Sequence, residues 1–282
     1  MRRTAWGIAG LLPLLAFVAA CQGSEAGPDA APSRAATAVA DAAAQAESAA
    51  TDSAPAPDAV ARSEKEENDL YQFGFAYPVQ AAAIPGLKAL LDKRLDAAKA
   101  DLVSSARSDK AEAAKDSYPY RAHSWEATWK VVTDLPDFLS LSADLYEFTG
   151  GAHGMSNFDS LVWDRRADTV REPLDLFTSK DALRVAIQAP FCDALDQERA
   201  KRRGEPVDRD SGQSFSECID PVASTVILGS SNRKTFDRIG VLVAPYEAGP
   251  YAEGSYEVTL PVTRKVMAAL KPQYREAFSV KP

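Results

Sequence analysis

The chain has 282 residues, a formal net charge of −8 and a sequence pI near 5.0. This acidic balance argues against binding to nucleic acid or to anionic lipid through charge, and it is compatible with cationic partners. The part of the chain from about Asn68 to Pro282 is long enough for one full-sized domain or two small ones.

The first residues have the pattern of an export signal. Arginines follow Met1, and an apolar run from Ala5 to Ala20 ends directly before Cys21. The run is short for a bilayer span of about 20 residues, and it contains a proline. Small residues before a cysteine resemble the lipobox of bacterial lipoproteins. We therefore expect residues 1–20 to be a signal peptide and Cys21 to be lipidated, with an ordinary signal peptide as the alternative.

The residue after this cysteine bears on the destination of the protein. Gln22 is not the aspartate of the usual inner-membrane retention signal. We therefore expect a lipid-anchored protein of the cell envelope, in the outer membrane and facing the periplasm. The membrane would then be a partner through the acylated Cys21.

Residues 22–66 contain no aromatic residue and no Leu, Ile or Met. Such a segment buries too little apolar surface to offset the entropy of ordering it. We expect residues 21–67 to be a lipidated cysteine followed by a disordered, Ala-rich tether. As a coil of about 45 residues, it would reach roughly 35–40 Å from the membrane.

Hydrophobic periodicity predicts the elements of the first part of the folded region, residues 68–172. Aromatic residues alternate in a strand at 69–77, and leucines at helical spacing predict an amphipathic helix at 85–107. Alternating apolar residues then predict an antiparallel meander with strands at 121–133, 138–148 and 158–164.

The second part, residues 173–282, begins with a turn at 175–178. A helix follows from Ser179 or Lys180 to about Lys201, and Pro190 should kink or interrupt it. Strands are expected at 222–228, 238–244 and 255–261, and Thr263 can cap a last helix at 264–271. The few βαβ alternations indicate an α+β fold of mostly antiparallel sheet with packed helices, in two sub-domains.

Cys192 and Cys218 are the cysteines that remain after Cys21. Two such residues in an oxidising periplasm usually form a disulfide, and closing this loop contributes roughly 3–4 kcal/mol in the chain-entropy model. The alternative is two free structural thiols. A redox role is disfavoured because no Cys-x-x-Cys spacing occurs.

A first motif with chemical potential is the run Tyr146-Glu147-Phe148-Thr149-Gly150-Gly151-Ala152-His153-Gly154. Its glycines permit positive φ and close approach of the backbone to another group. His153 suits a general base, a metal ligand, a recognition contact or a structural hydrogen bond. Ser156 and Asp159 near this histidine invite a triad interpretation, but no Gly-x-Ser-x-Gly elbow is present. The spacing of His123 and His153 suggests no metal site.

The second motif, Val243–Gly254, connects two expected strands and contains Tyr246, Glu247, Tyr251 and Glu253. It is either a rigid connection or a recognition loop, since Tyr combines a flat apolar face with a polar tip. Glu147 with Glu247 or Glu253 could form the carboxylate pair of a glycosidase, but such pairs arise by chance where acidic residues are abundant.

These two motifs resemble an extracytoplasmic domain family. The run Thr-Gly-Gly-Ala-His-Gly resembles the hallmark shared by RsiV-type anti-sigma proteins and PdaC-type peptidoglycan deacetylases. The second motif and Tyr256–Pro261 resemble the C-terminal half of the same domain. The resemblance covers roughly 68–275 and implies a PdaC-like N-terminal part, 68–172, and an RsiV-like C-terminal part, 173–282.

The resemblance implies binding more than catalysis. RsiV-type members bind lysozyme, whereas in PdaC-type members this region accompanies a catalytic domain that this sequence does not show. We therefore expect a non-catalytic periplasmic domain, without cofactor or metal, that binds a cell-wall component or a cell-wall-active protein such as lysozyme. The candidate binding residues are Thr149, Gly150, Gly151, His153, Gly154, Tyr246, Glu247, Tyr251 and Glu253.

Two other functions stay open at this point. An envelope hydrolase would use His153 with nearby carboxylates as acid and base, and it predicts a titratable partner within hydrogen-bond reach of that ring. A purely structural envelope lipoprotein predicts that both motif loops are buried connections.

Overall fold

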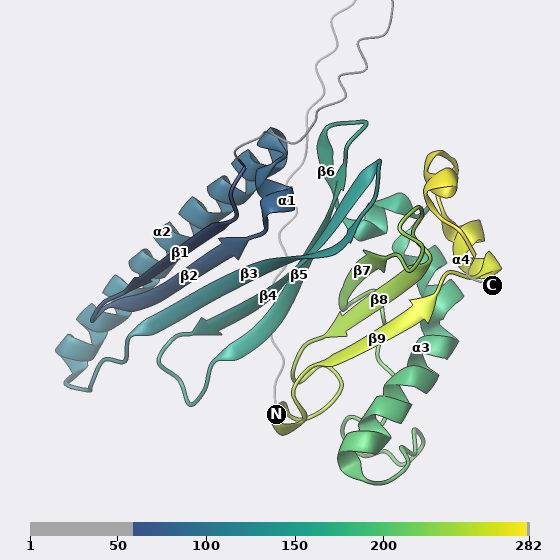
Figure 1. Ribbon diagram of the computed structural model, residues 1–282. Coiled ribbons are helices and arrows are strands. Elements are labelled where there is room, and N and C mark those ends of the chain that lie inside the picture. Colours follow the sequence, from purple (N-terminus) through teal and green to yellow (C-terminus); the bar gives the residue numbers. More distant parts are fainter. Residues whose placement is uncertain (1–58, 281–282) are drawn as a thin grey trace, which may run out of the picture. The chain divides into compact units, whose positions relative to one another are not determined.

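The computed structural model describes residues 59–280 (Figure 1). The expected signal peptide, the lipidation site Cys21 and most of the expected tether lie outside these residues. The described part contains two β-sheets with helices packed against them, so it has the α+β fold that the sequence predicts.

The first sheet has six strands in the order β1-β2-β3-β4-β5-β6. The strands span Arg62–Glu67, Tyr71–Tyr77, His123–Asp134, Phe138–Phe148, Met155–Asp164 and Thr169–Arg171. All neighbouring strands are antiparallel except β2 and β3, which are parallel. The connection between these two contains the helices α1, Val79–Ala82, and α2, Pro85–Asp116. This βαβ unit is the parallel exception in a sheet that is otherwise antiparallel.

The tether was expected to extend to residue 67, but the folded part begins earlier, with β1. Residues Arg62–Glu67, placed in the tether by their composition, form an edge strand that pairs with β2. Lys99 of α2 lies 3.1 Å from Glu64 and 2.6 Å from Glu66. The strand carries charged side chains because it is an edge, where charge discourages pairing with other chains. Backbone pairing with β2 and ion pairs with Lys99 stabilise this strand. Because it has no apolar face, hydrophobic periodicity could not predict it.

Helix α2 runs along the first sheet beside β1 and β2 (Figure 1). The core of this half lies between the helix and the inner side chains of the strands. The alternating aromatic residues of β2, from Tyr71 to Tyr77, are all buried there. Leu87, Leu91 and Leu95 face them from the helix. The helix continues nine residues past its predicted end at 107, and Ala113 is still buried in its last turns. Small and charged residues in those turns obscured the period of 3.6.

The second sheet has three antiparallel strands in the order β7-β8-β9. They span Thr225–Gly229, Arg238–Val243 and Tyr256–Pro261, with α3 at Lys180–Arg203 and α4 at Arg264–Ala269. Short 3₁₀ helices complete this half at Pro173–Leu176, Tyr251–Glu253 and Pro272–Ala277.

The helix boundaries of this half follow from capping. Ser179 accepts a hydrogen bond from the backbone of Ala182, and Gly204 ends α3 in the left-handed region. Thr263 caps α4 as the sequence predicts. Pro190 was expected to kink or interrupt α3. The helix runs without a break from Lys180 to Arg203, so Pro190 does not interrupt it, and the kink stays a prediction.

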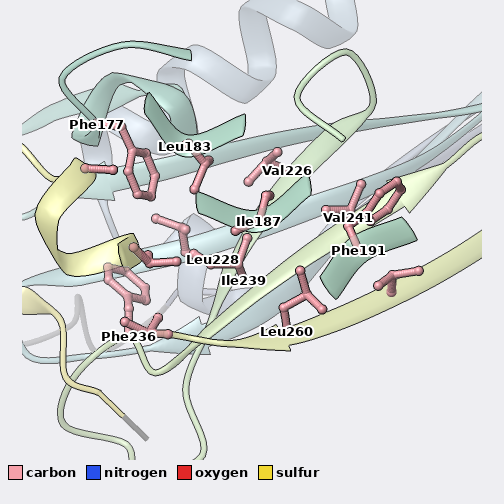
Figure 2. Close-up of a cluster of buried hydrophobic side chains, with 14 of the residues drawn as sticks. Phe177, Leu183, Ile187, Phe191, Val226, Leu228, Phe236, Ile239, Val241 and Leu260 are labelled. Atoms are coloured by element: carbon pink, nitrogen blue, oxygen red, sulfur yellow. The ribbon is translucent and has the colours of Figure 1, made fainter. Parts of the chain in front are cut away.

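The core of the second sheet is formed by apolar side chains of α3 that lie against β7 and β8 (Figure 2). Leu183, Ile187 and Phe191 belong to this cluster from the helix side. Phe138 and Val162 of the first sheet are part of the same cluster. The start of β4 and the end of β5, which lie away from the β4–β5 loop, are therefore buried on both faces.

Two hydrogen bonds link the sheets directly. The hydroxyl of Ser160 donates to the carbonyl of Val226 at 2.8 Å, and that of Thr225 donates to the carbonyl of Phe158 at 3.1 Å. These bonds join β5 to β7. They bring together the two halves that the sequence analysis treated as sub-domains.

The remaining boundary differences are small. Strand β5 begins at Met155, three residues earlier than predicted, and β7 begins at Thr225 instead of 222. The three-residue strand β6 was not predicted, because it is too short to show alternation.

The edge strand β1 gives the first testable prediction. A chain that begins at Asn68 should unfold with a free energy lower by roughly 1–3 kcal/mol than a chain that begins at Ala59. It loses the cross-strand pairs of β1, which contribute roughly 0.2–1 kcal/mol each, and the ion pairs with Lys99. Urea denaturation of the two chains measures the difference, and equal stabilities would contradict the assignment of a strand at 62–67.

Candidate functional site

The first motif begins in β4, and its residues 149–154 form the loop between β4 and β5. Gly150 has φ of 89°, a left-handed conformation that glycine adopts without steric penalty. Arg121 fixes this bend by donating from Nη1 to the carbonyl of Gly151 at 2.6 Å. Its guanidinium also lies over the ring of Phe148, 4.6 Å from the centroid. The loop therefore presents Thr149, Gly151 and His153 to solvent from a fixed backbone.

The second motif forms the connection between β8 and β9, residues 244–255. Tyr246 has φ of 72°, which is rare for an aromatic residue because its Cβ crowds the backbone. Its side chain is 46% exposed. A strained backbone that presents an exposed ring is typical of functional positions.

The two loops meet, although 93 residues separate His153 from Tyr246. The ring of His153 stacks on Tyr251 with centroids 4.0 Å apart and planes 24° apart. Tyr246 lies 6.2 Å from His153 and 5.6 Å from Tyr251. The Tyr251 hydroxyl donates to the carbonyl of Gly154 at 3.1 Å. We call His153, Tyr246 and Tyr251 the aromatic surface.

Both ring nitrogens of His153 lie near oxygen atoms. Nδ1 lies 2.9 Å from the carbonyl oxygen of Gly154, and Nε2 lies 3.4 Å from the hydroxyl of Tyr246. Because a carbonyl oxygen only accepts, Nδ1 donates the hydrogen in this contact. Both ring nitrogens therefore help to hold the ring of His153 in its stacked position.

Gly154 is required by a close approach. It is buried, and a Cβ at this position would overlap the ring and hydroxyl of Tyr146 from β4. Gly151 differs, since a Cβ there would meet no atom within 4 Å. The last glycine of the motif therefore makes room for Tyr146, which stays 36% exposed at the border of the site.

A depression of about 290 Å³ lies beside the aromatic surface. Its walls come from β3, β4, β5 and the start of the second loop. Met155 adds a further exposed apolar side chain. The lining residues are Trp125, Leu145, Tyr146, Glu147, Met155, Ser156, Asn157, Ala244, Pro245 and Glu247.

The two glutamates of the second loop have different surroundings. Glu247 accepts a hydrogen bond from the hydroxyl of Ser224 at 2.6 Å and is exposed. Glu253 points inward to Arg203, at 2.9 Å and 3.1 Å, and to the hydroxyl of Tyr256. Glu253, a predicted binding residue, is thus engaged in holding its own loop.

Electrostatics support this internal role of Glu253. Burial alone would raise the pKa of its carboxyl, but hydrogen bonds from Arg203 and Tyr256 outweigh burial and lower the pKa. For Tyr256, burial and the bond to Glu253 raise the pKa of the phenol. The carboxylate is therefore stabilised in its charged form, as expected of a paired structural group.

His153, Ser156 and Asp159 do not form a catalytic triad in the structure. Asp159 forms an ion pair with Arg94 at 2.7 Å, and Ser156 lines the depression. Within residues 59–280, neither ring nitrogen of His153 contacts a carboxylate. The other histidine, His123, is buried elsewhere against Asp109 at 3.1 Å. No group of three or more potential metal ligands occurs in the described part of the chain.

Several contributors were missed by sequence reasoning. Arg121 positions the first loop, Arg203 positions the second, and Met155 extends the apolar border. None of them stands out in the sequence, because surface arginines are common and only the fold brings these side chains to the loops.

Comparison with known proteins supports a PdaC-like domain in the first half. Residues 64–156 match the family model described as "Deacetylase PdaC". This match includes the first loop and ends before the second. The RsiV-like character of residues 173–282 is not part of it and stays a prediction. No curated protein matches the chain.

Solved structures with similarity include two DUF3298 family proteins. One, from Bacteroides fragilis NCTC 9343, has 18% identity, covers 74% of this chain and 91% of its own, and has a TM-score of 0.48. The other, from Pseudomonas aeruginosa PAO1, has 17% identity, covers 79% and 95%, and has a TM-score of 0.44.

Among residues 59–280, no helix has the length and apolar character needed to cross a bilayer.

The close approach at Gly154 gives the second prediction. Gly154→Ala should lower the free energy of unfolding by about 1–3 kcal/mol, because the new methyl group must displace Tyr146. Gly151→Ala is the matched control from the same loop and should change stability by less than about 0.5 kcal/mol. Denaturant titration measures both variants, and equal effects would show that Tyr146 does not pack on Gly154.

Proposed function

We propose that the protein is a lipid-anchored, non-catalytic domain of the cell envelope that binds a cationic cell-wall-active protein, such as a lysozyme, through the aromatic surface. Acylated Cys21 would hold it in the outer membrane, facing the periplasm. The observation that carries the proposal is the convergence of two loops, distant in sequence, on one exposed group of rings.

The composition of the site favours recognition of another protein. Tyr246 is 46% exposed, and Tyr146 and Met155 add exposed apolar side chains nearby. Tyr and Met are enriched in protein–protein interfaces relative to the rest of the surface. A tyrosine contributes a large contact area and loses little conformational entropy on binding. The adjoining depression of about 290 Å³ lies at the small end of the range for small-molecule pockets, and a single protruding side chain of a protein partner would fit its size.

Charge favours a cationic partner. The chain has a formal net charge of −8, and Glu147 and Glu247 line the depression as exposed carboxylates. Opposite charges speed association and make it sensitive to salt. The resemblance of the two motifs to the lysozyme-binding RsiV-type domain points to the same class of partner. The alternative ligand is a cell-wall glycan. The binding experiment below distinguishes this glycan from a protein partner.

The alternatives receive less support from the site. A hydrolase would need an acid or base partner for His153, and the contacts of its ring are a carbonyl and a tyrosine hydroxyl. A purely structural role would leave no reason for an exposed tyrosine on a strained backbone.

Binding of chicken-type lysozyme and of soluble muropeptides to residues 59–282 tests the proposal by calorimetry. We expect lysozyme to bind more tightly in low salt than in high salt. Tyr246→Ala should weaken binding by at least about tenfold, as expected for truncation of an interface anchor. Alanine keeps the Cβ, so the variant removes the ring with little change in the backbone preference at this position.

Val185→Ala is the control, since Val185 is 64% exposed on α3 and belongs to neither loop. Its affinity should equal that of the unsubstituted chain. Binding of muropeptides alone, with the same loss in Tyr246→Ala, would replace the protein partner by a cell-wall glycan. Binding of neither probe, or equal binding by Tyr246→Ala, would refute the proposed function.

A further inference from the structure

The most buried charge in the described residues lies beneath the second loop. Arg199 of α3 is 0% exposed. Its Nε donates to the carbonyl of Ala248 at 2.8 Å, and its Nη1 donates to the carbonyl of Glu217 at 3.0 Å. Asp196, one turn earlier, lies 3.1 Å from the same nitrogen. A buried guanidinium is tolerated only when such partners replace water, so these carbonyls are strongly held in place.

Arg203, one turn further along α3, repeats the pattern. It pairs with Glu253 and donates from Nη2 to the carbonyl of Ala248 at 3.4 Å. Its Nη1 donates to the carbonyl of Phe215 at 3.2 Å. Both arginines therefore bridge the same two segments, the second loop and the excursion at residues 204–217.

The excursion is itself fastened to α3. The disulfide Cys192–Cys218 is present, with Cα atoms 5.5 Å apart, and it closes the chain directly after Glu217. At the other side, Arg209 donates to Asp196 at 2.5 Å and to Asp193 at 3.0 Å. The arginines thus contact carbonyls whose positions depend on this clamp.

Besides the two arginines, the second loop is held by Ala248, which is buried in the core beneath α3, and by Arg202, which donates to the carbonyl of Glu253. Several of its backbone hydrogen bonds are internal, from Glu247 to Ala244, from Glu253 to Pro250 and from Gly254 to Tyr251. The hydroxyl of Ser224 reaches Glu247, and Tyr251 reaches Gly154. The strained φ of Tyr246 needs surroundings that hold it. The arginine bridge supplies such support from below.

We propose that Arg199 and Arg203 are positioning residues that couple the disulfide-clamped excursion to the second loop, so that Tyr246 and Tyr251 keep their places only while the clamp is closed. The importance of this coupling for binding rests on the proposed function, whereas the coupling itself is independent of any ligand. Opening the disulfide would let the carbonyls of Glu217 and Phe215 move, and each guanidinium would lose one of its acceptors.

Hydrogen exchange of residues 59–282, followed by mass spectrometry, tests the coupling without a ligand. Two variants open the bridge from opposite ends: the double substitution Cys192→Ala and Cys218→Ala, and Arg203→Gln. We expect amides of residues 244–254 to exchange at least about tenfold faster in both, while β2, β3 and β4 keep their protection. Arg184→Gln is the control, because Arg184 lies on the same helix and, within residues 59–280, its hydrogen bonds go to Asp181 and not to the second loop.

The outcomes are distinct. Unchanged exchange at 244–254 in either variant overturns the coupling, and so does equal acceleration in Arg184→Gln. If the double cysteine variant loses protection throughout, Arg203→Gln decides, since Arg203 is partly exposed and its removal leaves both cores intact. Lysozyme binding to Arg203→Gln is the second readout. Faster exchange without any lysozyme binding to the unsubstituted chain would keep the coupling and remove the proposed function.

Discussion

The far ends of β4 and β5 are buried on both faces, and the rest of the structure depends on this double burial. One face of these strands packs against α2, and the other contributes Phe138 and Val162 to the core beneath α3. Hydrogen bonds from Ser160 and Thr225 tie the two sheets at the same place. Because the β4–β5 loop and the β8–β9 connection extend from these joined sheets, the junction sets where they meet.

A charged interior then stabilises the meeting of the loops. A buried arginine such as Arg199 is rarely the most stable choice for a core position, since well-packed apolar residues often do as well or better. Its guanidinium can instead hold backbone carbonyls of two irregular segments at once, which an apolar side chain cannot do. Rings on irregular loops need this support because a recognition surface loses affinity when its side chains must be ordered on binding. In the proposed coupling, the excursion with its disulfide would support this surface.

The sequence predicted the regular elements well, because their signals are local. The alternating aromatics of β2 and the caps Ser179 and Thr263 are examples. The sequence missed β1 because this strand has no apolar residues that alternate. It also could not reveal that Arg199 is buried, since arginine is normally exposed. Both loops of the site were recognised from their glycines and aromatic residues. Their convergence was not predictable, because contacts across 93 residues depend on the packing of the two sheets, which leaves no periodic signal in the sequence.

Stacking of His153 on Tyr251 is the contact that most directly expresses this account, and NMR of residues 59–282 measures it. The account predicts nuclear Overhauser contacts between the two rings, and ring protons of His153 that move downfield when Tyr251 is replaced by Leu, because the ring current of the tyrosine is lost. A histidine with no contact to Tyr251 and with the same chemical shifts in both proteins would contradict it. The two loops would then not form one surface.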